Sequence, residues 1–234
     1  MTATQHRSTA RSAKKSRGAG PRDPERTSAA ILAAAVSEFT DKGYAGARID
    51  AIARRSGANK RMIYHYFGDK DGLYRAVLES AYVGIRSSEA GLQLADLAPE
   101  KAIERLVAFT WDYFLAHPEF LSILSTENLH RAKFLKKSQR VLELHSPLVS
   151  AISDVLKRGA ASGTFRTGVD PVHLYISIAS LGIFYLSNRW TLSAIFARDL
   201  TAQPELRAWG RHISAVILGF LRPEKPLANK AARL

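Results

Sequence analysis

The chain has 234 residues, enough to bury a hydrophobic core either as one domain or as a small domain and a larger one. It contains no cysteine, which excludes disulfides, thiolate catalysis and zinc–cysteine sites, and we expect a cytoplasmic protein. The formal net charge is +13 and the pI is about 10.1, and this excess of positive charge favours a polyanionic partner.

The first 22 residues are basic and poor in large apolar side chains. They contain six lysines and arginines and no acidic residue, and Ser, Thr, Ala and Gly fill most other positions. Such a segment cannot bury enough surface to fold, and no apolar stretch follows it as in a secretory signal. We expect residues 1–22 to be a disordered arm that adds phosphate affinity and reaches the minor groove. The alternative is a solvated tail without contacts.

The first predicted helix begins at Pro24, because a Pro-Glu pair is typical of a helix start. Its apolar stripe covers residues 31–39, and Gly43 ends it. A short second helix follows over residues 49–55, where apolar side chains recur at positions i, i+3 and i+4 and therefore share one face.

A tight turn and a third helix come next. Gly57 provides the left-handed backbone that ends the second helix, and Asn59 is a good N-cap for the third. Cationic and hydrogen-bonding groups at the start of such a helix are what a recognition helix needs in the major groove of DNA. The groups present there are Lys60, Arg61, Tyr64 and His65.

Three segments resemble the TetR family of bacterial transcriptional regulators: Gly43-Tyr44, Ile52–Asn59 and Tyr64–Leu73. The likeness runs from about residue 31 to about residue 78. The family usually has Thr or Ser just before the first helix of the motif, where this chain has Ala47-Arg48. Alanine cannot cap a helix, so the expected phosphate contact there falls to the arginine. The alternative is two amphipathic helices in an unrelated bundle.

The chemistry of each side chain suggests its role on DNA. Lys60 and Arg61 are candidates for reading base edges, because both donate to guanine O6 and N7. Met62 is a candidate contact to a thymine methyl, or it only packs, and Ile63 is assigned to packing. Arg48, Tyr64, His65 and Lys70 are assigned to phosphates, which fix register without reading sequence, and Asn59 caps the helix. The predicted DNA-binding set is Arg48, Asn59, Lys60, Arg61, Met62, Tyr64, His65 and Lys70.

No later segment alternates as a strand does, so the fold is predicted to be all α, with about nine helices. We expect a basic arm (1–22), a helix-turn-helix DNA-binding domain (23–70), a larger helical ligand-binding and dimerisation domain (71–222) and a flexible tail (223–234). After the motif, the helices are predicted from residue 69 or 70 onwards, then over 103–114, 118–129, 131–162 with an interruption near Pro147, 171–189 and 204–221.

The last two helices are strongly apolar. Residues 172–186 are apolar nearly all round, but this run is shorter than the roughly 20 residues that a membrane span needs. The final helix carries a heptad-like apolar seam. Both helices carry more apolar surface than one small domain covers. The TetR resemblance implies that the helices at 171–189 and 204–221 pair with their copies in a homodimer.

The resemblance also implies a C-terminal pocket for a small-molecule effector, and this half resembles TetR-type regulators of nitrogen-heterocycle or aromatic-acid catabolism. Candidate lining residues are aromatics and isolated polar groups on apolar helices, although core packing also explains the aromatics. Asn128 and Asn188 are preferred, because a buried amide needs partners; the segment 188–190 also suits a helix C-terminus. The candidates are Trp111, Phe114, Glu127, Asn128, Phe184, Tyr185 and Asn188.

The predicted function is a DNA-binding transcriptional regulator, a dimeric repressor released from a palindromic operator by a small apolar effector with one anionic or amide group. No carboxylate pair has a recognisable catalytic spacing, and the histidines lack i, i+4 pairing. We therefore expect no catalysis, no metal and no cofactor. The alternative is an architectural or constitutive DNA-binding protein without a ligand, which would occupy many genomic sites.

Overall fold

The computed structural model describes residues 23–223, which contain nine α-helices, two short 3₁₀ helices and no strand. The all-α class and the approximate number of helices are confirmed. The predicted arm (1–22) and all but the first residue of the predicted tail (223–234) lie outside the described residues. The elements are α1 (Pro24–Gly46), α2 (Ile49–Ser56), α3 (Lys60–Phe67), α4 (Lys70–Ala90), η1 (Leu94–Asp96), α5 (Pro99–Ala116), α6 (Pro118–Leu129), η2 (Leu135–Lys137), α7 (Gln139–Ala161), α8 (Pro171–Phe196) and α9 (Gln203–Leu221).

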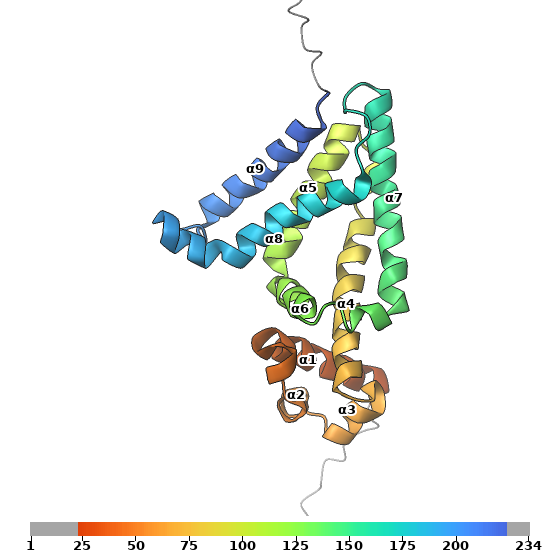
Figure 1. The fold of residues 1–234 in the computed structure, drawn as a ribbon. Coiled ribbons are helices and arrows are strands. Elements are labelled where there is room, and N and C mark those ends of the chain that lie inside the picture. The colour runs from red at the N-terminus through yellow and green to blue at the C-terminus, as the bar shows by residue number, and fades with distance from the viewer. Residues whose placement is uncertain (1–22, 224–234) are drawn as a thin grey trace, which may run out of the picture.

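The first three helices form a small head at one end of the molecule (Figure 1). The carboxylate of Asp23 caps α1 by accepting a hydrogen bond from the Glu25 amide at 3.0 Å. The regular part of α1 ends at Gly43, as predicted, because its φ of 63° suits a residue without Cβ. The apolar cluster of the head continues into the larger part through Tyr74 and Phe134. Its fully buried members in the head include Ile31, Phe39, Ile52 and Ile63.

Helices α4 to α9 form the larger bundle, in which α5 packs against α7, α8 and α9. Two glycines allow close approach to α5. A Cβ on Gly182 of α8 would lie 3.1 Å from the Phe114 ring, and a Cβ on Gly210 of α9 would lie 2.9 Å from the Trp111 ring. Both aromatic side chains are buried. The absence of side chains at these two positions therefore sets how closely the last two helices approach the core.

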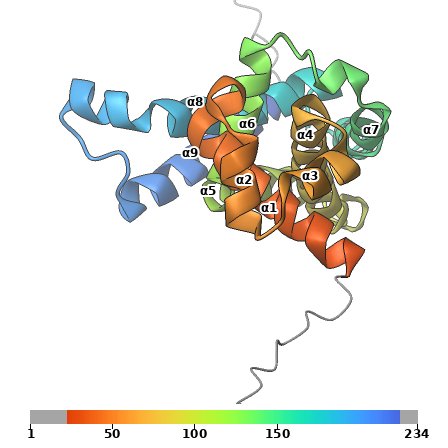
Figure 2. The same ribbon diagram turned by 90° about the horizontal axis from the view of Figure 1, so that it is seen from below.

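The distal ends of α8 and α9, with the turn that joins them, project away from the rest of the bundle (Figures 1 and 2). The predicted end of α8 at residue 189 is wrong, because the helix continues to Phe196. Hydroxyls in this extension bond back to the helix: Thr191 donates to the carbonyl of Asn188, and Ser193 to that of Arg189. α9 begins one residue earlier than predicted.

The segment between α6 and α8 also differs from the prediction. Its helix begins at Gln139 rather than near residue 131, because two successive residues, Arg131 and Ala132, adopt positive φ values of 55° and 58°. Pro147 lies inside α7 instead of dividing it. Since proline has no N–H, it leaves one carbonyl of that helix without its usual intrahelical donor.

Candidate nucleic-acid interface and effector pocket

The turn between α2 and α3 has the geometry predicted from its sequence. Gly57 has a left-handed φ of 67°, which ends α2. The side-chain oxygen of Asn59 accepts a hydrogen bond from the Met62 amide at 2.9 Å and caps α3. Ile63 is fully buried in the head cluster and fixes which face of α3 points inward. The opposite face of α3 is thereby directed to solvent.

Of the predicted DNA contacts on α3, Arg61 and His65 lie on this face, whereas Lys60, three residues before Ile63, is at the N-terminal end of the helix. Lys60, Arg61 and His65 are exposed, and Tyr64 keeps 47% of its surface accessible. Lys60 forms an ion pair with Asp50 of α2, an interaction that the sequence did not indicate. Asp50 lies in the first turn of α2, and both partners are largely solvent-accessible. The pair is therefore weak enough for a phosphate or a base to replace the carboxylate.

Two further cations flank α3. Arg48 is exposed at the start of α2, where it makes no side-chain cap, as the weak capping sequence predicts. Its backbone N–H donates to the buried carboxylate of Glu38 at 3.2 Å. Lys70 begins α4, with its ammonium 4.8 Å from the centre of the Tyr44 ring. Burial lowers the pKa of Lys70, and the nearby charge of Arg48 lowers it further, so the two cations border one surface.

Tyr44 also joins the head to the larger bundle. Its hydroxyl donates to Asp71 of α4, and its ring contacts His130 and Phe134 of the α6–α7 connection, with ring centroids 5.3 and 4.7 Å apart. Burial raises the pKa of Tyr44 to about 12, and the hydrogen bond to Asp71 adds to the shift. The same bond lowers the pKa of Asp71. This junction was not predicted, since its members are distant in sequence.

The predicted effector residues do not converge on one cavity. Trp111 and Phe114 are buried in the core, where they pack on the glycines of α8 and α9. Glu127 is also buried, and its Oε1 accepts hydrogen bonds from the amides of Phe134 and Leu135 at 2.8 and 2.9 Å. Glu127 therefore holds the turn after α6, which explains its burial without a ligand.

The expected burial of the two asparagine amides is wrong. Asn128 is exposed, and Asn188 is only partly buried. Each side-chain N–H donates to the carbonyl four residues earlier, that of Leu124 at 2.9 Å and that of Phe184 at 2.8 Å. Because each amide donates within its own helix and is at least partly open to solvent, neither amide requires a ligand partner.

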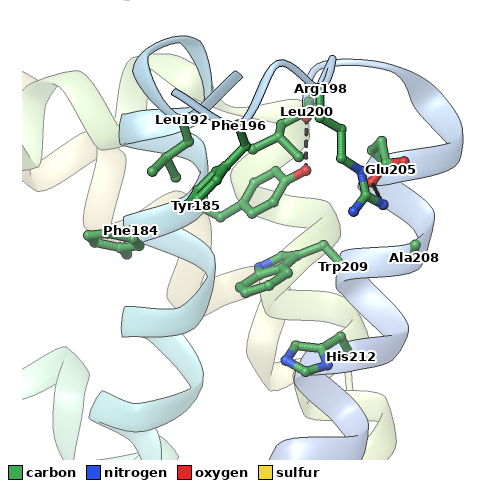
Figure 3. A pocket seen from close by; sticks show the side chains of 10 residues that line it. All are labelled: Phe184, Tyr185, Leu192, Phe196, Arg198, Leu200, Glu205, Ala208, Trp209 and His212. Carbon is green, nitrogen blue, oxygen red and sulfur yellow. Dashed lines mark hydrogen bonds and ion pairs between the residues drawn. The ribbon is translucent and has the colours of Figure 1, made fainter. Parts of the chain in front are cut away.

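Two predicted residues, Phe184 and Tyr185, line a pocket of about 870 Å³ between α8 and α9 (Figure 3). Tyr185 donates to the carbonyl of Leu200 at 2.9 Å, and its ring stacks on Trp209 with centroids 4.7 Å apart. An exposed ion pair between Arg198 and Glu205 lies at one end. The other residues along the pocket are Leu192, Phe196, Ala208 and His212.

Two family profiles match the chain in the regions described above. Residues 31–77 match the bacterial regulatory proteins of the tetR family, and residues 99–217 match the tetracyclin repressor-like C-terminal domain. The chain belongs to the TetR family. The resemblance seen in the helix-turn-helix motif is thus confirmed and extends through the C-terminal part.

Two named relatives and one solved structure are similar to this chain. The chain is 42% identical over 205 residues to the HTH-type transcriptional repressor NicS of Pseudomonas putida, covering 88% of this chain and 97% of NicS. It is 36% identical over 164 residues to the repressor SCO4008 of Streptomyces coelicolor, covering 69% of this chain and 81% of SCO4008. The structure of FadR from Bacillus subtilis in complex with stearoyl-CoA shares the fold, with a TM-score of 0.62 and 16% sequence identity. The match covers 83% of this chain and 99% of the FadR chain.

Family membership makes this chain a DNA-binding transcriptional regulator, and both named relatives are repressors. Within residues 23–223, no helix is both long and apolar enough to cross a membrane. The same residues contain no group of three or more His, Cys, Asp or Glu side chains that could hold a metal ion.

Proposed function

We propose that this TetR-family regulator is a dimeric repressor that a small effector releases from a palindromic operator. The observation that carries the proposal is the orientation of α3. With Ile63 buried, Arg61 projects from the opposite, exposed face, and Lys60 is exposed at the first residue of α3. A two-fold dimer presents two such helices to successive major grooves, roughly 34–36 Å apart, so each operator should contain two inverted half-sites.

The apolar α8–α9 face supports the dimer. Most of the exposed large hydrophobic side chains among the described residues lie on these two helices, whereas Leu206, Ile213 and Ile217 of α9 face the core of their own chain. An apolar surface of this kind on a soluble protein is typical of an interface between subunits. The apolar α8–α9 face consists of Val172, Ile176, Phe184, Trp190, Ile195, Phe196, Val216 and Phe220.

The effector that we propose is a small, mainly apolar molecule with one polar group. The FadR structure contains stearoyl-CoA, so the same fold accommodates a small molecule in that protein. For release, the effector must bind the non-binding arrangement of the two heads more tightly than the operator-bound one. A coupling free energy of about 1–3 kcal/mol corresponds to roughly 5- to 150-fold weaker operator binding.

Genome-wide footprinting of the full-length chain tests the proposal. A repressor should protect few sites, each with two inverted half-sites, while an architectural protein would protect many unrelated sequences. Protection spread evenly over genomic DNA would contradict the proposal. Once an operator is known, calorimetric titration of an effector with and without that DNA tests release, because linkage requires operator DNA to weaken effector binding by the same factor.

A further inference from the structure

A buried polar cluster lies in the C-terminal bundle, distant in sequence from the recognition helix. Arg86 and Glu89 of α4 keep only 7% and 5% of their surface accessible, and they form an ion pair one helical turn apart. The guanidinium of Arg86 also donates to the hydroxyl of Tyr175 on α8 at 2.8 Å. A buried ion pair stabilises a fold poorly, because removing both charges from water offsets most of their attraction. The cluster therefore suggests a functional role.

The hydrogen-bonding capacity of this ion pair is incompletely used. Within the described residues, Nε of Arg86 and Oε1 of Glu89 are both buried and have no partner. Buried polar atoms are normally satisfied, so each such atom needs an explanation. One of these two atoms is a donor and the other an acceptor. Their natural complement is a group that presents an acceptor and a donor side by side.

Both residues line a pocket of about 400 Å³ between α4, η1 and α7. This volume suits a small ligand. Gln93, also on the pocket wall, has a positive φ of 49°, a strained conformation that often marks ligand sites. Pro147 lines the α7 side and leaves that turn of the helix with one hydrogen bond fewer. The wall around the ion pair is therefore able to adjust.

We propose that this pocket binds the uncharged amide group of a small, mainly apolar carboxamide or lactam. The amide carbonyl accepts from Nε–H of Arg86, and the amide N–H donates to Oε1 of Glu89. Since neither atom is solvent-accessible in this structure, a small side-chain rotation accompanies binding. The proposal rests on the effector-released repressor proposed above and names the chemical class of its effector.

Charge explains why an amide fits better than a carboxylate. A carboxylate would pair with Arg86 but would place its negative charge against Glu89. Burial raises the pKa of Glu89, so this carboxylate gains from a ligand N–H that stabilises its charged form. The site also lies on α4, whose first residue, Lys70, borders the DNA-binding surface. A change in the position of α4 would therefore reach the head.

Calorimetric titration of the full-length chain with benzamide and benzoate tests the proposal. These probes have the same shape and differ in the amide N–H and the charge. We expect benzamide to bind at least about tenfold more tightly than benzoate, because a mispaired buried polar group weakens binding by this order. In Glu89→Gln, the new amide donor suits a carboxylate, and the order of the two affinities should reverse. Glu100→Gln, an exposed change on α5, is the matched control and should leave both affinities unchanged.

Equal binding of the two probes, no binding of either one, or an equal loss of both in Glu89→Gln would overturn the proposal. If Glu89→Gln does not fold, as judged by its melting curve, Ala151→Leu replaces it. Ala151 lines the pocket from α7, so the larger side chain should abolish benzamide binding; unchanged binding would overturn the proposal. Operator affinity is measured separately. Amide binding without any change in operator affinity would retain the site and contradict only the release that we propose.

Discussion

At the scale of single residues, the two cations that open α3 differ in their existing partners. Lys60 is paired with Asp50, whereas Arg61 has no hydrogen bond or ion pair within residues 23–223. The planar fork of an arginine can donate two bonds to one guanine. Arg61 is therefore the stronger candidate for direct readout, and Lys60 must first exchange its carboxylate partner.

Replacing Arg61 with alanine should relax the preference at one base pair in each half-site. The expected loss against the preferred base is about 1–3 kcal/mol, measured by binding to operator variants with each base at that position. Arg207→Ala removes an exposed arginine on α9 and serves as the control without an effect on base preference. An equal loss on every sequence would instead identify Arg61 as a phosphate contact.

Tyr44→Phe should destabilise the fold by about 1 kcal/mol at pH 7, because it removes the hydrogen bond to Asp71. The pKa of Asp71 is lowered in the folded chain, so its stabilising contribution is complete above the ordinary value near 4 and is lost as the pH falls through the folded value. The difference in unfolding free energy between the two proteins should therefore shrink below about pH 4.

Denaturant unfolding at pH 7 and near pH 3 measures this difference. Tyr64→Phe, which changes an exposed tyrosine of α3, is the control and should match the parent chain at both values. A constant difference between the parent chain and Tyr44→Phe would show that the hydroxyl acts independently of the charge on Asp71.

At the scale of elements, close approach to α5 fixes the last helices. Gly210→Ala would place a Cβ 2.9 Å from the Trp111 ring, and we expect a loss of about 1–3 kcal/mol in unfolding free energy from overpacking. Gly91→Ala is the matched control, because its Cβ would make only an ordinary contact at 3.4 Å. Equal stability of the two variants would mean that α9 shifts without cost.

The turn between α2 and α3 could be predicted from the residues that form it. Gly57 and Asn59 determine the boundaries of the turn through effects within a few residues, and both act as predicted. The burial of Asn128 depends on how α6 is rotated in the bundle, which its sequence does not specify. The polar pair of Arg86 and Glu89 was missed because an i, i+3 pair usually lies on a solvated helix face. Three-dimensional packing alone distinguishes the two cases.

At the scale of the whole molecule, we propose that the apolar α8–α9 face pairs with the same face of a second copy. Ile176→Glu places a charge in this face, where 52% of the side chain is exposed in the single chain, and should convert the dimer to a monomer. Leu129→Glu changes an even more exposed residue on α6 and should leave the dimer intact. Light scattering at micromolar concentration measures the molecular mass of both variants and of the parent chain. A parent chain that is already a monomer would contradict the dimer.

The most direct test of a dimeric, sequence-reading repressor is selection of bound fragments from a pool of random DNA. We predict enrichment of one motif with two inverted half-sites, whose centres are separated by about 10 base pairs or a multiple of that spacing, as two recognition helices related by a two-fold axis require. The motif that the Arg61→Ala variant selects should have one specified base pair fewer in each half-site than the motif that the parent chain selects. A single half-site, or no enrichment over the starting pool, would contradict the account.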